Sequence, residues 1–290
     1  MTTNTLAPAS TSSGSADVTA ARLTFAGLLR SEFIKLRSVR STVWCYALVL
    51  GITIVFALLI TLWVTSQSGG DLFGGGAQGT ALLVSTLGVS FSQLVVCVLG
   101  VLVISGEYGT GMIRSTFTAV PRRLPALFAK VTVFGAVTFL VSIVAILVAA
   151  VATAPLLAGA DLAPDLFASD LIVPLIGAAA YLMLVGILSL ALGAIIRNSA
   201  GGIAAALGFI LVVPTIVQTI GAITQSVIIA NIFAFLPSSA GASLYQTGIE
   251  SSVAENGLIT LDATQGGLVL LGWVALFLVL ASVLLKRRDV

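Results

Sequence analysis

Histidine is absent from this 290-residue chain, cysteine occurs only twice, and 8% of the residues are charged. Two separate cysteines without histidine make no plausible transition-metal site. Cys45 and Cys97 both fall in apolar stretches, so they form no disulfide framework. In a typical soluble domain about a quarter of the residues are charged. The composition therefore excludes a soluble catalytic domain and indicates an integral membrane protein.

Six long apolar stretches divide the sequence, at approximately residues 43–65, 80–105, 127–154, 171–196, 200–224 and 267–285. A helix needs about 20 residues to cross a bilayer. If the N-terminus is cytoplasmic, all 13 Lys and Arg residues fall on the cytoplasmic side, with Lys130 counted at the cytoplasmic end of the third stretch. Short loops rich in Lys and Arg stay in the cytoplasm. The sequence thus predicts an all-α polytopic membrane protein with six transmembrane helices and both termini cytoplasmic.

The acids follow the opposite distribution, because most of them fall in the three outer loops. These acids are Asp71, Asp161, Asp165, Asp170, Glu250, Glu255 and Asp262. We expect no charged side chain within the spans themselves. Proton-coupled carriers generally hold ionisable groups inside the membrane, so this expectation argues against a proton-coupled carrier.

Three parts are expected along the chain. Residues 1–20 are rich in Thr, Ser and Ala and predict a disordered tail rather than a cleaved signal peptide. Residues 21–41 predict an amphipathic helix along the membrane interface, with Phe25, Leu29, Phe33 and Leu36 on one side. Residues 42–290 form the six-helix transmembrane domain.

The last outer loop, about 225–266, contains a short apolar segment. Residues 226–236 (SVIIANIFAFL) are too few to cross a bilayer, and Pro237 follows them. We expect a re-entrant or interfacial segment over about 226–237. In a competing interpretation, 215–236 is a full span. That choice would place the basic C-terminal residues 286–288 outside, against the charge distribution.

The segment Gly106-Glu-Tyr-Gly-Thr-Gly111 has the glycines of a phosphate-binding loop but lacks the rest of the motif. A P-loop needs Lys and then Ser or Thr directly after its second glycine, whereas Met112 and Ile113 follow Gly111. The chain is therefore not expected to bind a nucleotide or to be an enzyme. Any ATP hydrolysis belongs to another polypeptide.

The stretch SGEYGTGMIRSTFTAVPRRLPALFAK, residues 105–130, resembles the first cytoplasmic loop of ABC-2 type transporter permeases, the membrane subunits of bacterial two-component ABC exporters. That family's pattern is a Glu, a Gly-Thr pair, a short coupling helix, a Pro-x-x-Arg-like turn and a later Lys. The matching residues here are Glu107, Gly109, Thr110, Pro121, Arg122, Arg123 and Lys130. The entry segment Arg30-Ser-Glu-Phe-Ile-Lys-Leu-Arg37 and the six-span layout are similar to the family as well. The Arg122-Arg123 doublet departs from the pattern and leaves open which arginine corresponds.

The resemblance implies an ABC-2 (type V exporter-like) transmembrane fold and a multi-pass permease of the bacterial cell membrane. It implies a cytosolic ABC ATPase that carries ATP and Mg²⁺, a second permease subunit in a homo- or heterodimer, and no nucleic-acid partner. In this reading Gly109 and Thr110 begin a coupling helix that inserts apolar side chains into the ATPase. The coupling residues are Glu107, Gly109, Thr110, Met112, Ile113, Phe117, Arg122 and Arg123.

Several alternatives stay open at this point. Glu107 is either a strut that transmits motion or a helix-end carboxylate paired with Arg114 or another nearby base. Two polar sets either line the translocation path or form interhelical hydrogen bonds; they are Thr86, Ser90 and Gln93 in the second span and Thr215, Gln218 and Thr219 in the fifth. The alternative functions are a non-transporting membrane sensor or assembly partner and, after it, a secondary transporter.

Overall fold

The computed structural model describes residues 24–66, 76–112, 123–246, 252–253 and 257–287. The predicted tail at 1–20 lies outside these residues. The described part is almost entirely helical, and six helices or helix pairs are long and apolar enough to cross a membrane; the count is seven if the bent pair in the last loop is one broken span. The six are Arg40–Ser66, Gly76–Gly109, Leu124–Ala158, Ser169–Ile196, Ser199–Thr224 and Ala263–Arg287. These ranges agree with the sequence prediction of an all-α, multi-pass membrane protein.

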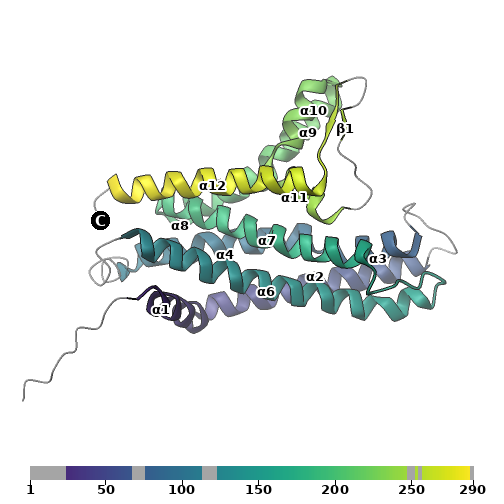
Figure 1. The fold of residues 1–290 in the computed structure, drawn as a ribbon, viewed down its shortest axis with the longest axis horizontal. Helices are drawn as coiled ribbons and strands as arrows, with labels where there is room; N and C mark the ends of the chain where they lie inside the picture. Colours follow the sequence, from purple (N-terminus) through teal and green to yellow (C-terminus); the bar gives the residue numbers. More distant parts are fainter. Residues whose placement is uncertain (1–23, 67–75, 113–122, 247–251, 254–256, 288–290) are drawn as a thin grey trace, which may run out of the picture.

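The elements run in order as follows: α1 Phe25–Ser38, α2 Arg40–Ser66, α3 Gly76–Thr86, α4 Val89–Gly109, α6 Arg123–Ala158, α7 Ser169–Ile196, α8 Ser199–Leu207, the π-helical turn η1 Gly208–Val212, α9 Val213–Thr224, α10 Val227–Ala234, α11 Pro237–Ala242, the 3-10 turn η2 Ser243–Tyr245, β1 Ser252–Val253, β2 Ile259–Thr260 and α12 Ala263–Arg287. The two short strands pair antiparallel, with Ser252 opposite Thr260. Figure 1 shows the long helices lying side by side as one bundle.

Helix α7 is the centre of the bundle and packs against α4, α6 and α12. Nearly all of its residues from Leu171 to Ala194 are apolar, and most are buried. Small residues let α4 approach it closely: a Cβ added at Gly100 would lie 3.1 Å from the backbone nitrogen of Leu190. Membrane helices associate through such close packing, because lipid removes the hydrophobic drive between them.

The second span is broken, where the sequence predicted one continuous stretch. Helix α3 ends at Thr86 and α4 begins at Val89, with a turn at Leu87 and Gly88. Gly88 lies directly against α2, since a Cβ there would be 2.7 Å from the Cα of Thr53. Thr53 and Ser92 are buried and hydrogen-bonded to each other at 3.0 Å, which ties α2 to α4 just past the turn.

The fifth span changes from α8 to α9 through the π-helical turn η1. The Val213 amide donates to the Gly208 carbonyl, one residue further back than in an α-helix. Pro214 follows at the start of α9 and has no amide proton to give. Figure 1 shows α9 and α10 leaving the bundle together as a projecting hairpin.

Residues 215–236 are not one helix, contrary to the competing interpretation of a full span. Helix α9 ends at Thr224, Gln225 adopts a left-handed conformation with φ of 51°, and α10 starts at Val227. The helical segments 227–234 and 237–245 then meet at a bend of 62°. The placement of this region relative to the membrane stays a prediction.

The described termini lie at the same end of the bundle, which is named the α1 end below (Figure 1). Helix α1, the end of α4, the start of α6, the end of α7 and the end of α12 meet there. The described basic residues belong to the helix ends that meet here, whereas Asp161, Asp165, Asp170 and Asp262 adjoin the other ends of α6, α7 and α12. The side of the membrane that each end faces stays a prediction.

Two alanines give a matched test of orientation, because both are exposed and lie at opposite ends of α7. In a background with Cys45 and Cys97 replaced, Ala163→Cys is expected to react with a membrane-impermeant maleimide on intact cells. Ala200→Cys is expected to react only after permeabilisation. Labelling of Ala200→Cys on intact cells would reverse the orientation that the Lys and Arg distribution predicts.

Candidate functional site

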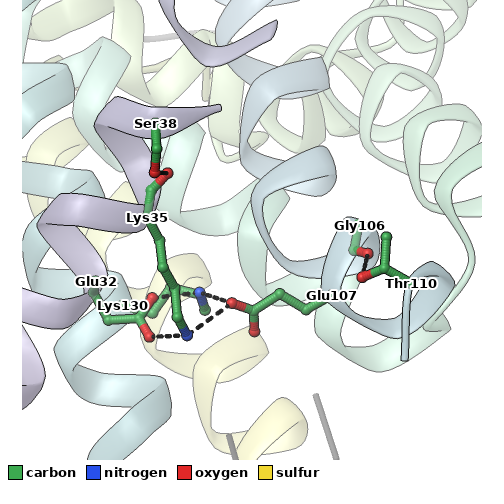
Figure 2. A network of polar contacts seen from close by, with 7 residues as sticks. All are labelled: Glu32, Lys35, Ser38, Gly106, Glu107, Thr110 and Lys130. Atoms are coloured by element: carbon green, nitrogen blue, oxygen red, sulfur yellow. Dashed lines mark hydrogen bonds and ion pairs between the residues drawn. The ribbon is translucent and has the colours of Figure 1, made fainter. Parts of the chain in front are cut away.

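Four charged side chains meet in a buried cluster at the α1 end (Figure 2). Glu32 and Lys35 come from α1, Glu107 from the last turn of α4, and Lys130 from the second turn of α6. Glu32, Glu107 and Lys130 are only 6%, 4% and 6% exposed, so three of the four charges are removed from water. We call these four residues the ion cluster.

Helix α1 brings two members of the ion cluster because of how it rests on the bundle. Thr24 caps its first turn by accepting a hydrogen bond from the Gly27 amide at 3.2 Å. One turn apart on the face that meets the bundle, Glu32 and Leu36 are buried. Phe25 and Phe33, from the predicted apolar side, are about half exposed. They point away from the bundle, as an interfacial helix requires.

Each lysine of the ion cluster bridges both glutamates. The Lys35 ammonium lies 2.8 Å from Glu32 Oε1 and 3.2 Å from Glu107 Oε1. The Lys130 ammonium lies 2.9 Å from Glu107 Oε1 and is also paired with Glu32 Oε2. Two carboxylates and two ammonium groups balance to zero net charge, which is what makes their burial tolerable.

The surroundings act on Lys35 in two opposing ways. Burial disfavours its charged form, but the hydrogen bond with Glu32 and the charges of Glu107 and Glu32 together outweigh the effect of burial. The net result raises the pKa of Lys35 above its ordinary value. Lys35 therefore stays protonated at neutral pH and holds its place between the two carboxylates.

One oxygen of the ion cluster is left over. Both oxygens of Glu32 and Oε1 of Glu107 accept from lysines, whereas Glu107 Oε2 is buried and has no hydrogen-bond partner among the described residues. A cavity of about 270 Å³ lies near the ion cluster, between α1, α2, α4 and α6. Its walls include Glu107 and Lys130 together with apolar side chains such as Leu99, Leu102 and Val133.

The expectation of spans without charged residues stays a prediction, because the bounds of the helices do not fix where the membrane begins. Glu107 lies within the candidate span Gly76–Gly109 and Lys130 within Leu124–Ala158. Both span helices extend a few residues further toward the α1 end than the hydropathy pattern predicted. The two charges are hidden between helices, where an ion pair is the alternative to an isolated charge in lipid.

The last turns of α4 also contact the turn between α7 and α8. The Arg197 guanidinium lies 5.2 Å from the centre of the Tyr108 ring, close enough for a cation–π interaction. Ser105 and Ser199 share a hydrogen bond of 2.8 Å. Consequently, Glu107 links the end of α4 to α1 and α6, while Ser105 and Tyr108 link it to the turn between α7 and α8.

The structure shows which basic side chains pair with Glu107. Arg114, the named candidate base, lies outside the described residues, and the described partners are Lys35 and Lys130. Glu32 and Lys35 were within the entry segment that resembled the family but were not named as site residues. The sequence feature that could have singled them out is the carboxylate of Glu32, one turn before Leu36 on an otherwise apolar side of the helix. This feature identifies no particular partner.

Gly109 and Thr110 do not start a helix as expected; they end α4. Gly109 is its last residue, and both the amide and the hydroxyl of Thr110 donate to the Gly106 carbonyl. The turn continues at Gly111 with φ of 72°, and Met112 is 41% exposed. Arg123 begins α6. Ile113, Phe117, Arg122 and the side chain of Arg123 lie outside the described part.

The two polar sets proposed for the translocation path lie on separate parts of the chain. Thr86 and Gln93 are buried; Thr86 donates to the Leu82 carbonyl, and Gln93 accepts from the Tyr181 hydroxyl on α7. The interhelical alternative therefore describes Gln93, while Ser90 is exposed. Thr215, Gln218 and Thr219 are exposed on the projecting α9. Their role in a path stays a prediction.

Comparisons with known proteins give no match that identifies this site. No protein-family model matches the chain, and no curated protein matches it. The assignment of the ion cluster therefore rests on the loop motif and on the geometry described above.

Removal of one charge from the ion cluster is expected to destabilise the protein strongly. Lys130→Met leaves two buried carboxylates with one cation and is expected to lower the free energy of unfolding by about 3–5 kcal/mol. Lys286→Met, at an exposed end of α12, is the control and should change it by less than about 0.5 kcal/mol. Unfolding in detergent, followed by tryptophan fluorescence, measures both.

The pairing itself is tested by a double-mutant cycle. Glu107→Gln combined with Lys130→Met keeps the ion cluster neutral, so its loss of stability should be well below the sum of the two single losses. Simple additivity would contradict direct coupling between these side chains.

Proposed function

We propose that the chain is the membrane-spanning permease subunit of an ATP-driven ABC-2 type exporter. In this proposal it works as a homo- or heterodimer of permease subunits in the bacterial cell membrane and forms the translocation path. A separate cytosolic ABC ATPase binds ATP and Mg²⁺, because the glycines at 106–111 lack the Lys and Ser or Thr of a P-loop.

The observation that carries the proposal is the ion cluster itself. Glu107 and Lys130 are the first and last residues of the family-like loop pattern, 23 positions apart, and they form a direct ion pair. Glu32 and Lys35 belong to the family-like entry segment, and they complete the same cluster. The two segments that carry the sequence resemblance thus converge on one point.

This arrangement suits a loop that transmits force. The loop is anchored at both ends, because Glu107 precedes it and Lys130 follows it. A displacement of the loop would move the ends of α4 and α6 together with α1, and the contacts of Tyr108 and Ser105 would extend the movement to the turn before α8. Buried ion pairs suit such a task, because breaking one leaves an uncompensated charge and the helices therefore move as a unit.

The packing of the bundle supports a partner subunit. Helix α2, the α8–α9 span and α12 are mostly unburied within the single chain. Exposed large apolar side chains on them include Leu59, Ile216, Ile220, Leu268 and Val279. Lipid covers part of these faces, and in the proposal a second permease subunit covers the rest.

Energy coupling gives the first test of the proposal. The purified chain alone is expected to hydrolyse no ATP, because the nucleotide site lies on the partner. With its ATPase, found as the protein that copurifies from the native membrane, it should form a stable complex with altered hydrolysis. Transport by the reconstituted chain alone, driven by a proton or sodium gradient, would refute the exporter proposal.

Two changes separate docking from force transmission. Phe117→Ala is expected to weaken ATPase association by about tenfold or more, because burial of such a side chain contributes roughly 1.5–3 kcal/mol. Phe128→Ala is the matched control, since Phe128 is an exposed phenylalanine that lies on helix α6 and is not among the residues predicted to dock. Glu107→Gln with Lys35→Gln keeps the ion cluster neutral and is expected to preserve assembly while hydrolysis no longer drives transport.

Complex yield and transport are measured for each variant in proteoliposomes. If Phe117→Ala assembles and transports normally, the loop is a simple connector. If the neutral double variant transports as well as the original chain, the ion cluster has a structural role alone.

A further inference from the structure

A groove of about 390 Å³ lies between the start of α6 and the second half of α12. Its lining includes Leu124, Phe128, Ala275, Val279, Val283 and Lys286. The residues from α12 recur at steps of three or four and therefore share one face of that helix. Phe128, Val279 and Val283 are between 41% and 60% exposed, so the groove is open on its outer side. We call it the α6–α12 groove.

The α6–α12 groove is apolar along its length and charged at one end. Lys286 is exposed at that end, and it is the one charged side chain among the described residues that line the groove. Helix α12 has no charged residue from Ala263 to Leu285. Because a charge at the centre of a bilayer is costly, Lys286 lies at the level of the lipid head groups when α12 spans a membrane.

The length of the α6–α12 groove matches one lipid chain. From Ala275 to Lys286 the helix rises about 17 Å, at about 1.5 Å per residue. One leaflet provides half of the hydrocarbon core of a bilayer, roughly 15 Å. An acyl chain whose head group lies beside Lys286 would therefore end near Ala275.

The charge at the end of the groove selects the head group. The exposed ammonium of Lys286 attracts a phosphate, and no carboxylate among the described lining residues opposes a negatively charged lipid. A zwitterionic lipid has a cation of its own beside the phosphate, so it gains less from Lys286 than a lipid with a net negative charge.

A second copy of the chain fits this groove less well than a lipid does. Among the described residues, the carboxylates at the α1 end are Glu32 and Glu107, and both are buried in the ion cluster. A second copy therefore offers Lys286 no described carboxylate at the same level.

We propose that the α6–α12 groove binds an anionic phospholipid, with its phosphate beside Lys286 and one acyl chain along Val283 and Val279 toward Ala275. Lipid then covers this strip of α12, and the second subunit of the exporter proposal covers other faces. The inference does not depend on the exporter proposal, because binding involves the single chain and the bilayer.

The experiment uses the full chain in phosphatidylcholine nanodiscs that contain a small fraction of a photoreactive lipid. The probe is phosphatidylglycerol with a diazirine and an alkyne on one acyl chain, and the matched probe is phosphatidylcholine with the same chain. Saturable labelling is expected at groove residues of α6 and α12. The anionic probe should label them about fivefold more, which is the effect of one Lys or Arg near an anionic lipid.

Two variants with matched controls locate the lipid, and all four substituted residues are exposed. Lys286→Gln should lower labelling by the anionic probe about fivefold, to the level of the zwitterionic one. Arg40→Gln, at the start of α2, should leave it unchanged. Val283→Trp should remove labelling of the groove by both probes, because the larger side chain occupies it. Val55→Trp, on α2, should have no effect.

The opposite results overturn the inference. Equal labelling by the two probes excludes selection of an anionic head group. A preference that survives Lys286→Gln, or labelling that is unsaturable or as strong on α2, leaves the groove as ordinary lipid-facing surface. In a background with Cys45 and Cys97 replaced, disulfide cross-linking of Ser282→Cys between two copies would assign the groove to a second subunit instead.

Discussion

The arrangement of the α1 end depends on an ion cluster that three helices form together. The chain has few charged residues, yet two carboxylates and two ammonium groups are gathered in one place, and Glu32, Glu107 and Lys130 among them are buried. Any one of them alone would be strongly unfavourable there. Because Glu32 and Lys35 on α1 complete the set begun by Glu107 and Lys130, helix α1 is held against α4 and α6 in one position.

Elsewhere in the bundle, contact geometry rather than charge sets the positions of the helices. Helix α7 runs through the centre and is buried along most of its length, and close backbone approach at Gly100 brings α4 against it. Buried hydroxyls add specific points of contact, such as Tyr46 with Thr138 between α2 and α6 at 2.9 Å. Such packing interactions hold membrane helices together where lipid offers no hydrophobic gain.

The interactions that hold the helices together therefore differ between the α1 end and the rest of the bundle. At the α1 end, ion pairs, the Tyr108–Arg197 contact and the Ser105–Ser199 hydrogen bond connect nearly every helix that arrives there. Away from it, the π-helical turn before Pro214 redirects the fifth span, and α9 leaves the bundle with α10. In the proposed function, the linked helix ends at the α1 end would transmit a movement of the loop to the rest of the bundle.

The sequence by itself determined the six spans and their alternation, with boundaries within a few residues of the structure at most ends. It did so because a spanning helix satisfies its own backbone hydrogen bonds, so its signal is local: a run of about 20 apolar residues. The family-like loop pattern also identified Glu107 and Lys130 as notable residues. The placement of residues 113–122, which include Phe117, lies outside the described part, so their predicted docking role stays a prediction.

Only the tertiary structure decided which charges meet. Lys35 and Glu107 are 72 positions apart, and Lys130 and Glu32 are 98 apart, so no local spacing links them. One error has the same origin, because the Gly109-Thr110 pair was expected to begin a helix, whereas it closes α4. Whether a charge lies in water or within a bundle depends on which distant side chains pack around it, and that follows from the packing of whole helices.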